Sequence, residues 1–227
     1  TTMYCAVPTV LVMMQPDFGT AFVFICIMVF IYFIGRISWG YILTAAGGLA
    51  GCMPLAYYFV LSDSQRERID VFINPESDLQ NSGYNVAQSK IAIGSGQLTG
   101  KGFFSEGTLA QLRFVPERHT DFIFAGIVEG LGFVGGTIII CLFFALIFRW
   151  IYIAMRTKDS FGTCLVVGVA GMFTAHVFEN IGMTIGLMPV TGIPLPFISY
   201  GGSNLLTNLI GVGIVENVWM RRQSKKR

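Results

Sequence analysis

Charged residues are scarce in this chain of 227 residues. Lys, Arg, Asp and Glu together make up 12% of it, whereas a typical soluble domain has about 25%. Hydrophobic residues make up 53%, and the mean hydropathy is +0.65. These values exclude an ordinary soluble domain and predict an all-α polytopic membrane protein. The net charge of +2 gives no reason to expect a nucleic-acid partner.

Cysteine patterns that hold metals or form disulfide frameworks are also missing. The chain has five cysteines, all within apolar segments, and none of them forms a CxxC pair. We interpret them as small apolar residues of the helix packing, and we assign no metal site.

Most of the chain consists of long segments with few or no charged residues. Residues 18–35 and 37–62 carry none, 122–148 carry only Glu129, and 160–215 carry only Glu179. A membrane span needs roughly 20 apolar residues. We therefore predict five full spans, over the segments 18–35, 41–61, 122–148, 161–187 and 204–220.

The remaining charge is concentrated in residues 63–121, which hold 8 of the 13 acidic and 6 of the 15 basic residues. The other nine basic residues fall at Arg36, in 149–158 and in 221–227. If these three places are cytoplasmic, the spans alternate consistently. Residues 63–121 then form a large extracytoplasmic loop, and the C-terminus is cytoplasmic.

The start of the chain is unusual. Residues 1–14 are apolar but too short for a span, and they lack the basic residues of a signal peptide. We predict a truncated first helix with earlier helices missing. The predicted regions are 1–62 with that helix and two spans, the loop 63–121, and 122–227 with three spans, a Pro/Gly-rich outer loop at 188–203 and a basic tail.

Several sequence motifs occur in a fixed order along nearly the whole chain. They are Gln-Pro-Asp-Phe-Gly-Thr at 15–20, Asn-Pro-Glu-Ser-Asp at 74–78, the run 83–96, Gly-Lys-Gly at 100–102, Pro-Glu-Arg-His-Thr-Asp at 116–121 and Met-Pro-Val-Thr-Gly-Ile-Pro-Leu-Pro at 188–196 with its continuation to Ser203. Together they resemble the SEDS family of shape, elongation, division and sporulation proteins, and the last motif is most similar to its RodA branch. Two positions depart from the family pattern: Gly130 follows Glu129 where paired glutamates are common, and Asn204 follows Ser203.

The resemblance implies ten transmembrane helices, of which this chain matches the second half. It also implies a glycosyltransferase that polymerises lipid II into the glycan strands of the cell wall, in the bacterial cell membrane, alongside a class B penicillin-binding protein. We expect the isolated fragment to be inactive without the missing helices.

Asp78 is the candidate catalytic residue, because its place in the motif matches the aspartate that the family needs. A carboxylate near an apolar boundary suits a general base that deprotonates the acceptor hydroxyl. A turn or helix-cap role after Pro75 is the structural alternative. Glu76 is expected to matter less.

The leaving group of this reaction is a pyrophosphate, which needs positive charge or a divalent cation such as Mg²⁺. Lys101, between two glycines, is the first candidate to bind it, and Lys90 is the second, with Gln88 as a further substrate-binding residue. For Lys101, a solvated loop lysine or an interfacial lysine that contacts lipid phosphate is the structural alternative. Arg118 and His119 are predicted to line the same substrate cleft. For Thr120 and Asp121, helix capping competes with a catalytic role.

Residues 189–202 contain three prolines and three glycines, so a regular helix is not expected there. We interpret this segment as a loop that closes the cleft, with Ser199 as a substrate-binding residue. A serine-hydrolase role is disfavoured because no Gly-x-Ser-x-Gly motif surrounds it. Glu129 and Glu179 should face the bundle interior and have partners, since ionised groups in a membrane are costly.

Two other functions remain open from the sequence. A lipid II flippase would need a polar route through the bundle, lined by residues such as Glu129 and Glu179. A scaffold that only recruits a transpeptidase would not need Asp78. The concentration of charge in 63–121 favours the polymerase.

Overall fold

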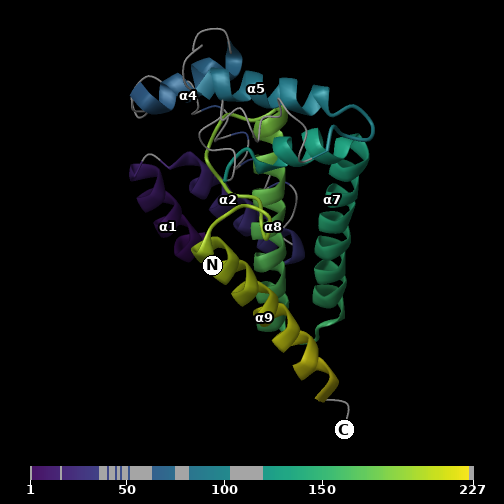
Figure 1. The fold of residues 1–227 in the computed structure, drawn as a ribbon. Helices are drawn as coiled ribbons and strands as arrows, with labels where there is room; N and C mark the ends of the chain where they lie inside the picture. The colour runs from purple at the N-terminus through teal and green to yellow at the C-terminus, as the bar shows by residue number, and fades with distance from the viewer. Residues whose placement is uncertain are drawn as a thin grey trace.

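The structure, a computed structural model, describes residues 2–15, 17–35, 63–74, 82–102 and 120–224, with the single positions 40, 44, 47 and 51. Every element in this part of the chain is an α-helix (Figure 1). The helices are α1 (Thr2–Met14), α2 (Phe18–Ile34), α4 (Asp63–Ile73), α5 (Ser82–Ser95), α7 (Ile123–Arg156), α8 (Ser160–Ile185) and α9 (Gly202–Ser224).

Two of these helices, α7 and α8, are long and apolar enough to cross a membrane. The apolar helix α2 has 17 residues and lies on the span predicted at 18–35. The spans predicted at 122–148, 161–187 and 204–220 correspond to α7, α8 and α9. The span predicted at 41–61 lies outside the described residues apart from positions 44, 47 and 51.

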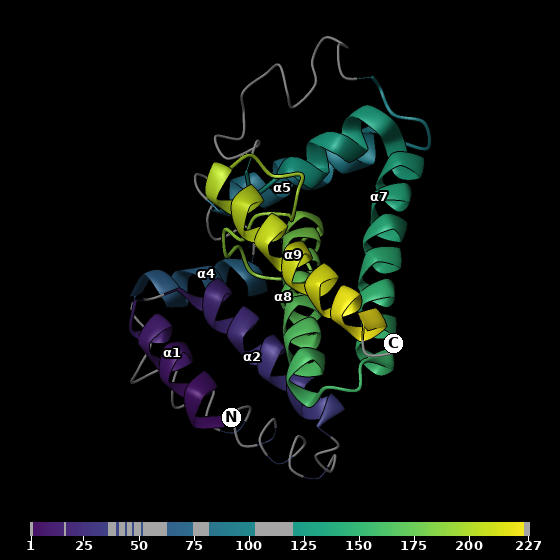
Figure 2. The ribbon, with the colours of Figure 1, turned by 90° about the horizontal axis from the view of Figure 1, so that it is seen from below.

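Helix α8 is the centre of the bundle and packs against α2, α5, α7 and α9 (Figure 2). Its Phe173 meets Trp150 of α7 edge-to-face, with ring centroids 4.7 Å apart. Its Gly171 lies against Phe30 of α2, where a Cβ would be only 3.1 Å from that ring. Small residues on α8 therefore let α2 approach closely, as is common where helices pack in a membrane.

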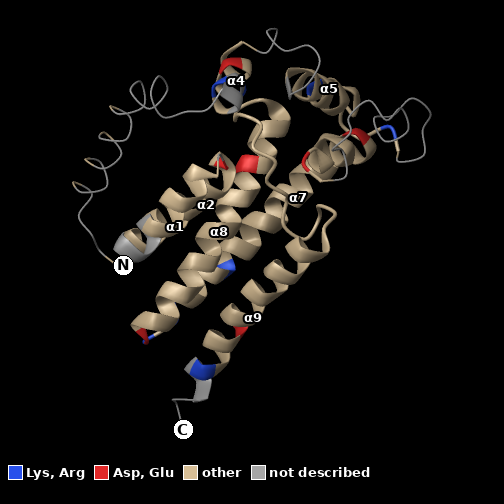
Figure 3. Cartoon of the chain, turned by 90° about the vertical axis from the view of Figure 1, so that its left-hand side faces the viewer, with Lys and Arg blue, Asp and Glu red and all other residues tan. Residues whose placement is uncertain are grey.

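Helices α4 and α5 lie across one end of this bundle, which we call the α4–α5 end (Figure 1). The long helices carry little charge over most of their length (Figure 3). Ser89 of α5 fixes this arrangement, since its buried hydroxyl donates a 2.7 Å hydrogen bond to the carbonyl of Thr184 near the end of α8. The part of the polar segment 63–121 that the structure describes is thus packed on the end of the bundle.

Two aspartates begin helices. Asp17 accepts hydrogen bonds from the backbone N–H and the hydroxyl of Thr20, at 3.0 and 2.6 Å. Asp159 accepts one at 3.0 Å from the backbone N–H of Gly162. These contacts satisfy amide groups that have no partner within the helix. For Asp17 they confirm the helix-starting role that its position after Pro16 suggests.

Phe122, and not Thr120 or Asp121, occupies the N-cap position of α7, and its side chain makes no capping hydrogen bond. The carbonyl of Thr120 instead accepts a hydrogen bond from Ser199, and that of Asp121 accepts one from Asn180. The loop after α8 therefore organises this entry to α7, which local sequence rules do not anticipate.

Candidate functional site

Helix α7 is broken near the α4–α5 end at Gly132, whose φ of 73° and ψ of −173° are open only to glycine. The turn after α5 docks on this break through backbone hydrogen bonds. The N–H groups of Phe133 and Val134 donate to the carbonyls of Gln97 and Leu98, at 2.7 and 3.2 Å. The turn therefore satisfies amide groups beside the interruption of the helix.

The same turn also pairs with the part of α7 that precedes Gly132. The N–H of Lys101 donates to the carbonyl of Glu129 at 2.9 Å, and that of Gly102 donates to Gly130 at 3.0 Å. Gly100 has a φ of 80° and lies so close to Gly130 that a Cβ would overlap its carbonyl. Backbone contacts and glycines together fix where Lys101 lies.

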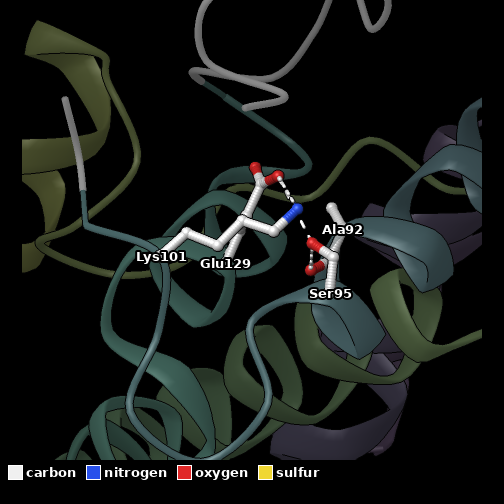
Figure 4. A network of polar contacts seen from close by, with 4 residues as sticks. All are labelled: Ala92, Ser95, Lys101 and Glu129. Carbon is white, nitrogen blue, oxygen red and sulfur yellow. Dashed lines mark hydrogen bonds and ion pairs between the residues drawn. The ribbon is translucent and has the colours of Figure 1, made fainter. Parts of the chain in front are cut away.

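Lys101 and Glu129 form an ion pair across this junction, with Nζ and Oε1 3.9 Å apart (Figure 4). The hydroxyl of Ser95 lies 3.4 Å from the same carboxylate oxygen. The Glu129 side chain is 5% exposed and that of Lys101 is 42% exposed. The prediction that Glu129 is buried and has a partner is confirmed, and the positive charge of Lys101 is partly compensated.

Lys90, the second predicted cation, belongs to α5 and lines a pocket between α4, α5 and the end of α8, together with Arg68 of α4. Arg68 belongs to no motif and lies in a run of mixed charge, so the sequence alone gives no reason to place it at a binding site. Only the packing of α4 over α5 brings these two cations to one pocket.

Residues 187–201, between α8 and α9, form no regular helix, as predicted. Ser199 is buried; its hydroxyl donates to the carbonyl of Thr120 at 2.6 Å and accepts from the N–H of Leu195 at 2.7 Å. The amide of Asn180 donates to the carbonyls of Asp121 and Ile193, at 2.9 and 2.7 Å. These bonds tie the loop to the start of α7, and substrate binding by Ser199 stays a prediction.

A second buried carboxylate, Glu179, is 1% exposed in α8. Within the described part of the chain, its Oε2 has no hydrogen-bond partner, and neither does the buried Oδ1 of Asn180. The interior position predicted for Glu179 is confirmed. His176, one turn earlier, has its Nδ1 3.3 Å from the carbonyl of Pro194, which gives this side chain a structural contact with the loop after α8.

Three of the predicted site residues, Asp78, Arg118 and His119, lie outside the described residues. Gln88 is half-buried on α5. Asp121 is also half-buried, and its Oδ2 lies against Gly192 of the loop, 3.4 Å from where a Cβ would be. Within the described part of the chain, no group of three His, Cys, Asp or Glu side chains is placed to hold a metal ion.

Comparison with known proteins gives consistent matches over nearly the whole chain. The family model described as "Cell cycle protein", FtsW/RodA/SpoVE, matches residues 1–224. Peptidoglycan glycosyltransferase MrdB of Escherichia coli is 44% identical over 216 residues, which are 95% of this chain and 58% of that relative. Stage V sporulation protein E of Bacillus subtilis is 42% identical over 92% of this chain and 56% of the relative.

Solved structures show the same fold. A chain in a peptidoglycan synthase complex that coordinates polymerization and crosslinking matches with a TM-score of 0.77 and 30% identity, over 96% of this chain and 61% of that one. The rod shape determining protein RodA of Thermus thermophilus matches with a TM-score of 0.64 and 26% identity, over 97% and 55%. This chain therefore spans a little over half the length of the curated relatives that it matches. With the all-helical bundle, these matches confirm a polytopic membrane protein, and the chain belongs to the FtsW/RodA/SpoVE family of cell cycle proteins, the SEDS family.

Proposed function

We propose that the protein is a peptidoglycan glycosyltransferase that polymerises lipid II for cell-wall elongation and cell shape. Relatives that cover most of this chain carry that activity in their names. The chain spans 58% of the first of them, so the activity is proposed for the whole protein that contains it. The observation that carries the proposal is that Lys90 on α5, Lys101 on the turn after α5 and Asp121 before α7 belong to the segments packed together at the α4–α5 end.

The transfer needs one base. A carboxylate removes the proton of the acceptor 4-hydroxyl, whose oxygen then bonds to the anomeric carbon of the donor sugar. The bond from that carbon to the pyrophosphate oxygen breaks, and the pyrophosphate leaves on its lipid. A base positioned in this way contributes about 10²- to 10⁴-fold.

Two carboxylates are candidates for the base. Asp78 follows from its motif and remains a prediction. Asp121 is supported by its half-buried position and by its carboxylate, which lies against the loop 187–201. Asn180 and Ser199 hold the backbone on either side of it. We assign Asp121 the stronger claim among the described residues.

The leaving group requires positive charge. Arg68, Lys90 and Lys101 supply it from the protein. A divalent cation such as Mg²⁺ is the alternative source of that charge, and no step is assigned to it here.

For topology, we propose that the α4–α5 end is extracytoplasmic and that the C-terminus is cytoplasmic. The basic residues around Arg156 and Arg221 lie toward the opposite ends of the long helices, which supports this orientation. The partner that we propose is a class B penicillin-binding protein, in keeping with the synthase complex that this fold resembles.

The test is polymerisation of purified lipid II by the full-length protein in proteoliposomes, with its partner transpeptidase present. Asp121→Asn should lower the rate by at least 10²-fold, and Asp78→Asn tests the other candidate in the same assay. Glu76→Gln is the control for a nearby loss of charge. Transport of lipid II without any polymer would favour the flippase and overturn the proposal.

A further inference from the structure

Two cations line one pocket at the α4–α5 end. Arg68 comes from α4 and Lys90 from α5. Neither is ion-paired with a carboxylate among the described residues, in contrast with Lys101 and Glu129. This arrangement reverses the ranking from the sequence, in which Lys101 came before Lys90 as an anion-binding residue.

The walls of the pocket are mostly apolar. They include Val71 and Phe72 of α4, Val86 of α5, and Val190 of the loop after α8. Apolar walls exclude water and so strengthen the attraction between a bound anion and the two cations. Mutual repulsion of the cations is relieved when an anion lies between them.

Lys90 has a defined place in this pocket. Its side chain lies directly over Gly186, where any Cβ would overlap the ammonium group. Gly186 is the C-cap of α8 with a φ of 76°, so the ammonium lies at the carbonyl end of that helix. A cation is favoured at this position by the helix dipole, which orders Lys90 without neutralising it.

The pocket also adjoins an apolar surface of the bundle. Met188 lines the pocket and packs on Gly182, which lines an apolar groove between α7 and α8. Leu187, between them, is 69% exposed and lines the same groove. A phosphate attached to a long apolar chain can therefore enter the pocket while its chain stays on the apolar face of the helices.

We propose that Arg68 and Lys90 bind the phosphate groups of a polyprenyl pyrophosphate, the lipid part of the substrate in the proposed function. The pocket has room for about one water-sized group, so it takes phosphate oxygens and excludes a sugar ring. In the transfer, the two cations hold the pyrophosphate on which negative charge accumulates as its bond to the sugar breaks.

The first experiment measures binding without chemistry. Radiolabelled undecaprenyl pyrophosphate is titrated into the full-length protein in nanodiscs of neutral lipid. Arg68→Gln and Lys90→Gln should each weaken binding roughly tenfold, as expected for one charge-assisted contact. Arg68→Lys and Lys90→Arg should retain most of it. The matched control is Lys158→Gln, an exposed cation at the opposite end of the bundle.

Competition identifies the source of the phosphate. Unlabelled undecaprenyl pyrophosphate should displace the label, whereas the same concentration of phosphatidylglycerol or inorganic pyrophosphate should not. Equal displacement by phosphatidylglycerol would make the pocket a general lipid anchor and overturn the proposal. Displacement by inorganic pyrophosphate alone would remove the role of the chain and overturn it too.

Kinetics separate this proposal from the proposed function. In lipid II polymerisation, Arg68→Gln and Lys90→Gln should raise KM about tenfold, with a smaller effect on kcat. If the wild type polymerises and both variants match it in binding and KM, the pocket assignment falls and the function stands. If the wild type makes no polymer but the variants lose binding, the function falls and the pocket stands.

Discussion

Lys101 and Glu129 join two segments that are 28 residues apart in the sequence, through an ion pair of 3.9 Å beside a backbone hydrogen bond of 2.9 Å. The carboxylate is buried and the ammonium is partly exposed, so the pair lies at the surface, beside the break in α7. An unpaired carboxylate at this depth would be costly. The pair is therefore expected to hold the turn 96–102 on α7.

A double-mutant cycle tests this pair. Glu129→Gln should destabilise the protein by roughly 1–2 kcal/mol, less than a fully buried pair because Lys101 is partly exposed. Lys101→Met alone should cost more than in the Glu129→Gln background, because it leaves a buried charge without its partner. Thermal unfolding in detergent measures all four forms. A coupling energy near zero would contradict the role of the pair.

The break in α7 depends on Gly132. Its backbone conformation is restricted to glycine, and a Cβ would overlap the backbone of Gly100 and Leu98. Gly132→Ala should therefore destabilise the protein by at least about 1–3 kcal/mol, the usual cost of such backbone strain.

Gly126 provides a matched control in the same helix. It has no atom within 4 Å of where its Cβ would be, so Gly126→Ala should be neutral or slightly stabilising. Thermal unfolding of both variants measures the difference. Similar stability of the two would show that the turn tolerates a side chain at Gly132.

Much of the fold could be predicted from the distribution of charge, because a membrane span needs a long apolar segment and few segments qualify. The break at Gly132 could not. Glycine is common throughout this chain, and only the contact with the distant Gly100 distinguishes this position. Long-range backbone pairing leaves no periodic pattern in a sequence.

The types of residue at the site could be predicted from the sequence. Which of these residues lie next to one another was harder to predict. The position of Lys101 between two glycines indicated that it could bind an anion, yet it is paired with Glu129. Arg68 belongs to no sequence motif, yet it shares a pocket with Lys90. Asp121 fitted a capping rule, but the loop after α8 supplies contacts that local rules do not include. In each case the packing of distant helices determines the role of the charge.

Ser199 tests whether the loop 187–201 is held as the structure indicates. Ser199→Ala removes a hydrogen bond to the carbonyl of Thr120 and one from the N–H of Leu195. Two buried backbone groups lose their partner, at about 1–3 kcal/mol each. Ser203→Ala, at an exposed position nearby, is the control. Unfolding midpoints measure both.

The same serine should not behave as a nucleophile. Its hydroxyl is buried and both its donor and acceptor capacities are used within the loop. Fluorophosphonate probes should leave the full-length protein unlabelled under conditions that label a serine hydrolase. Labelling that Ser199→Ala abolishes would show that the hydroxyl is reactive and would require another function for this loop.

Asn180 connects the loop to the candidate base, since one side-chain amide donates to the carbonyls of both Asp121 and Ile193. Asn180→Ala leaves those two carbonyls without this donor and loosens the placement of the Asp121 carboxylate. Because small displacements of a base reduce turnover strongly, kcat for lipid II polymerisation should fall by about 10-fold or more while KM changes little. Asn208→Ala, which loses only a contact with Asn204 in α9, is the control. A fall in stability with unchanged kcat would limit Asn180 to holding the fold and would weaken the assignment of Asp121 as the base.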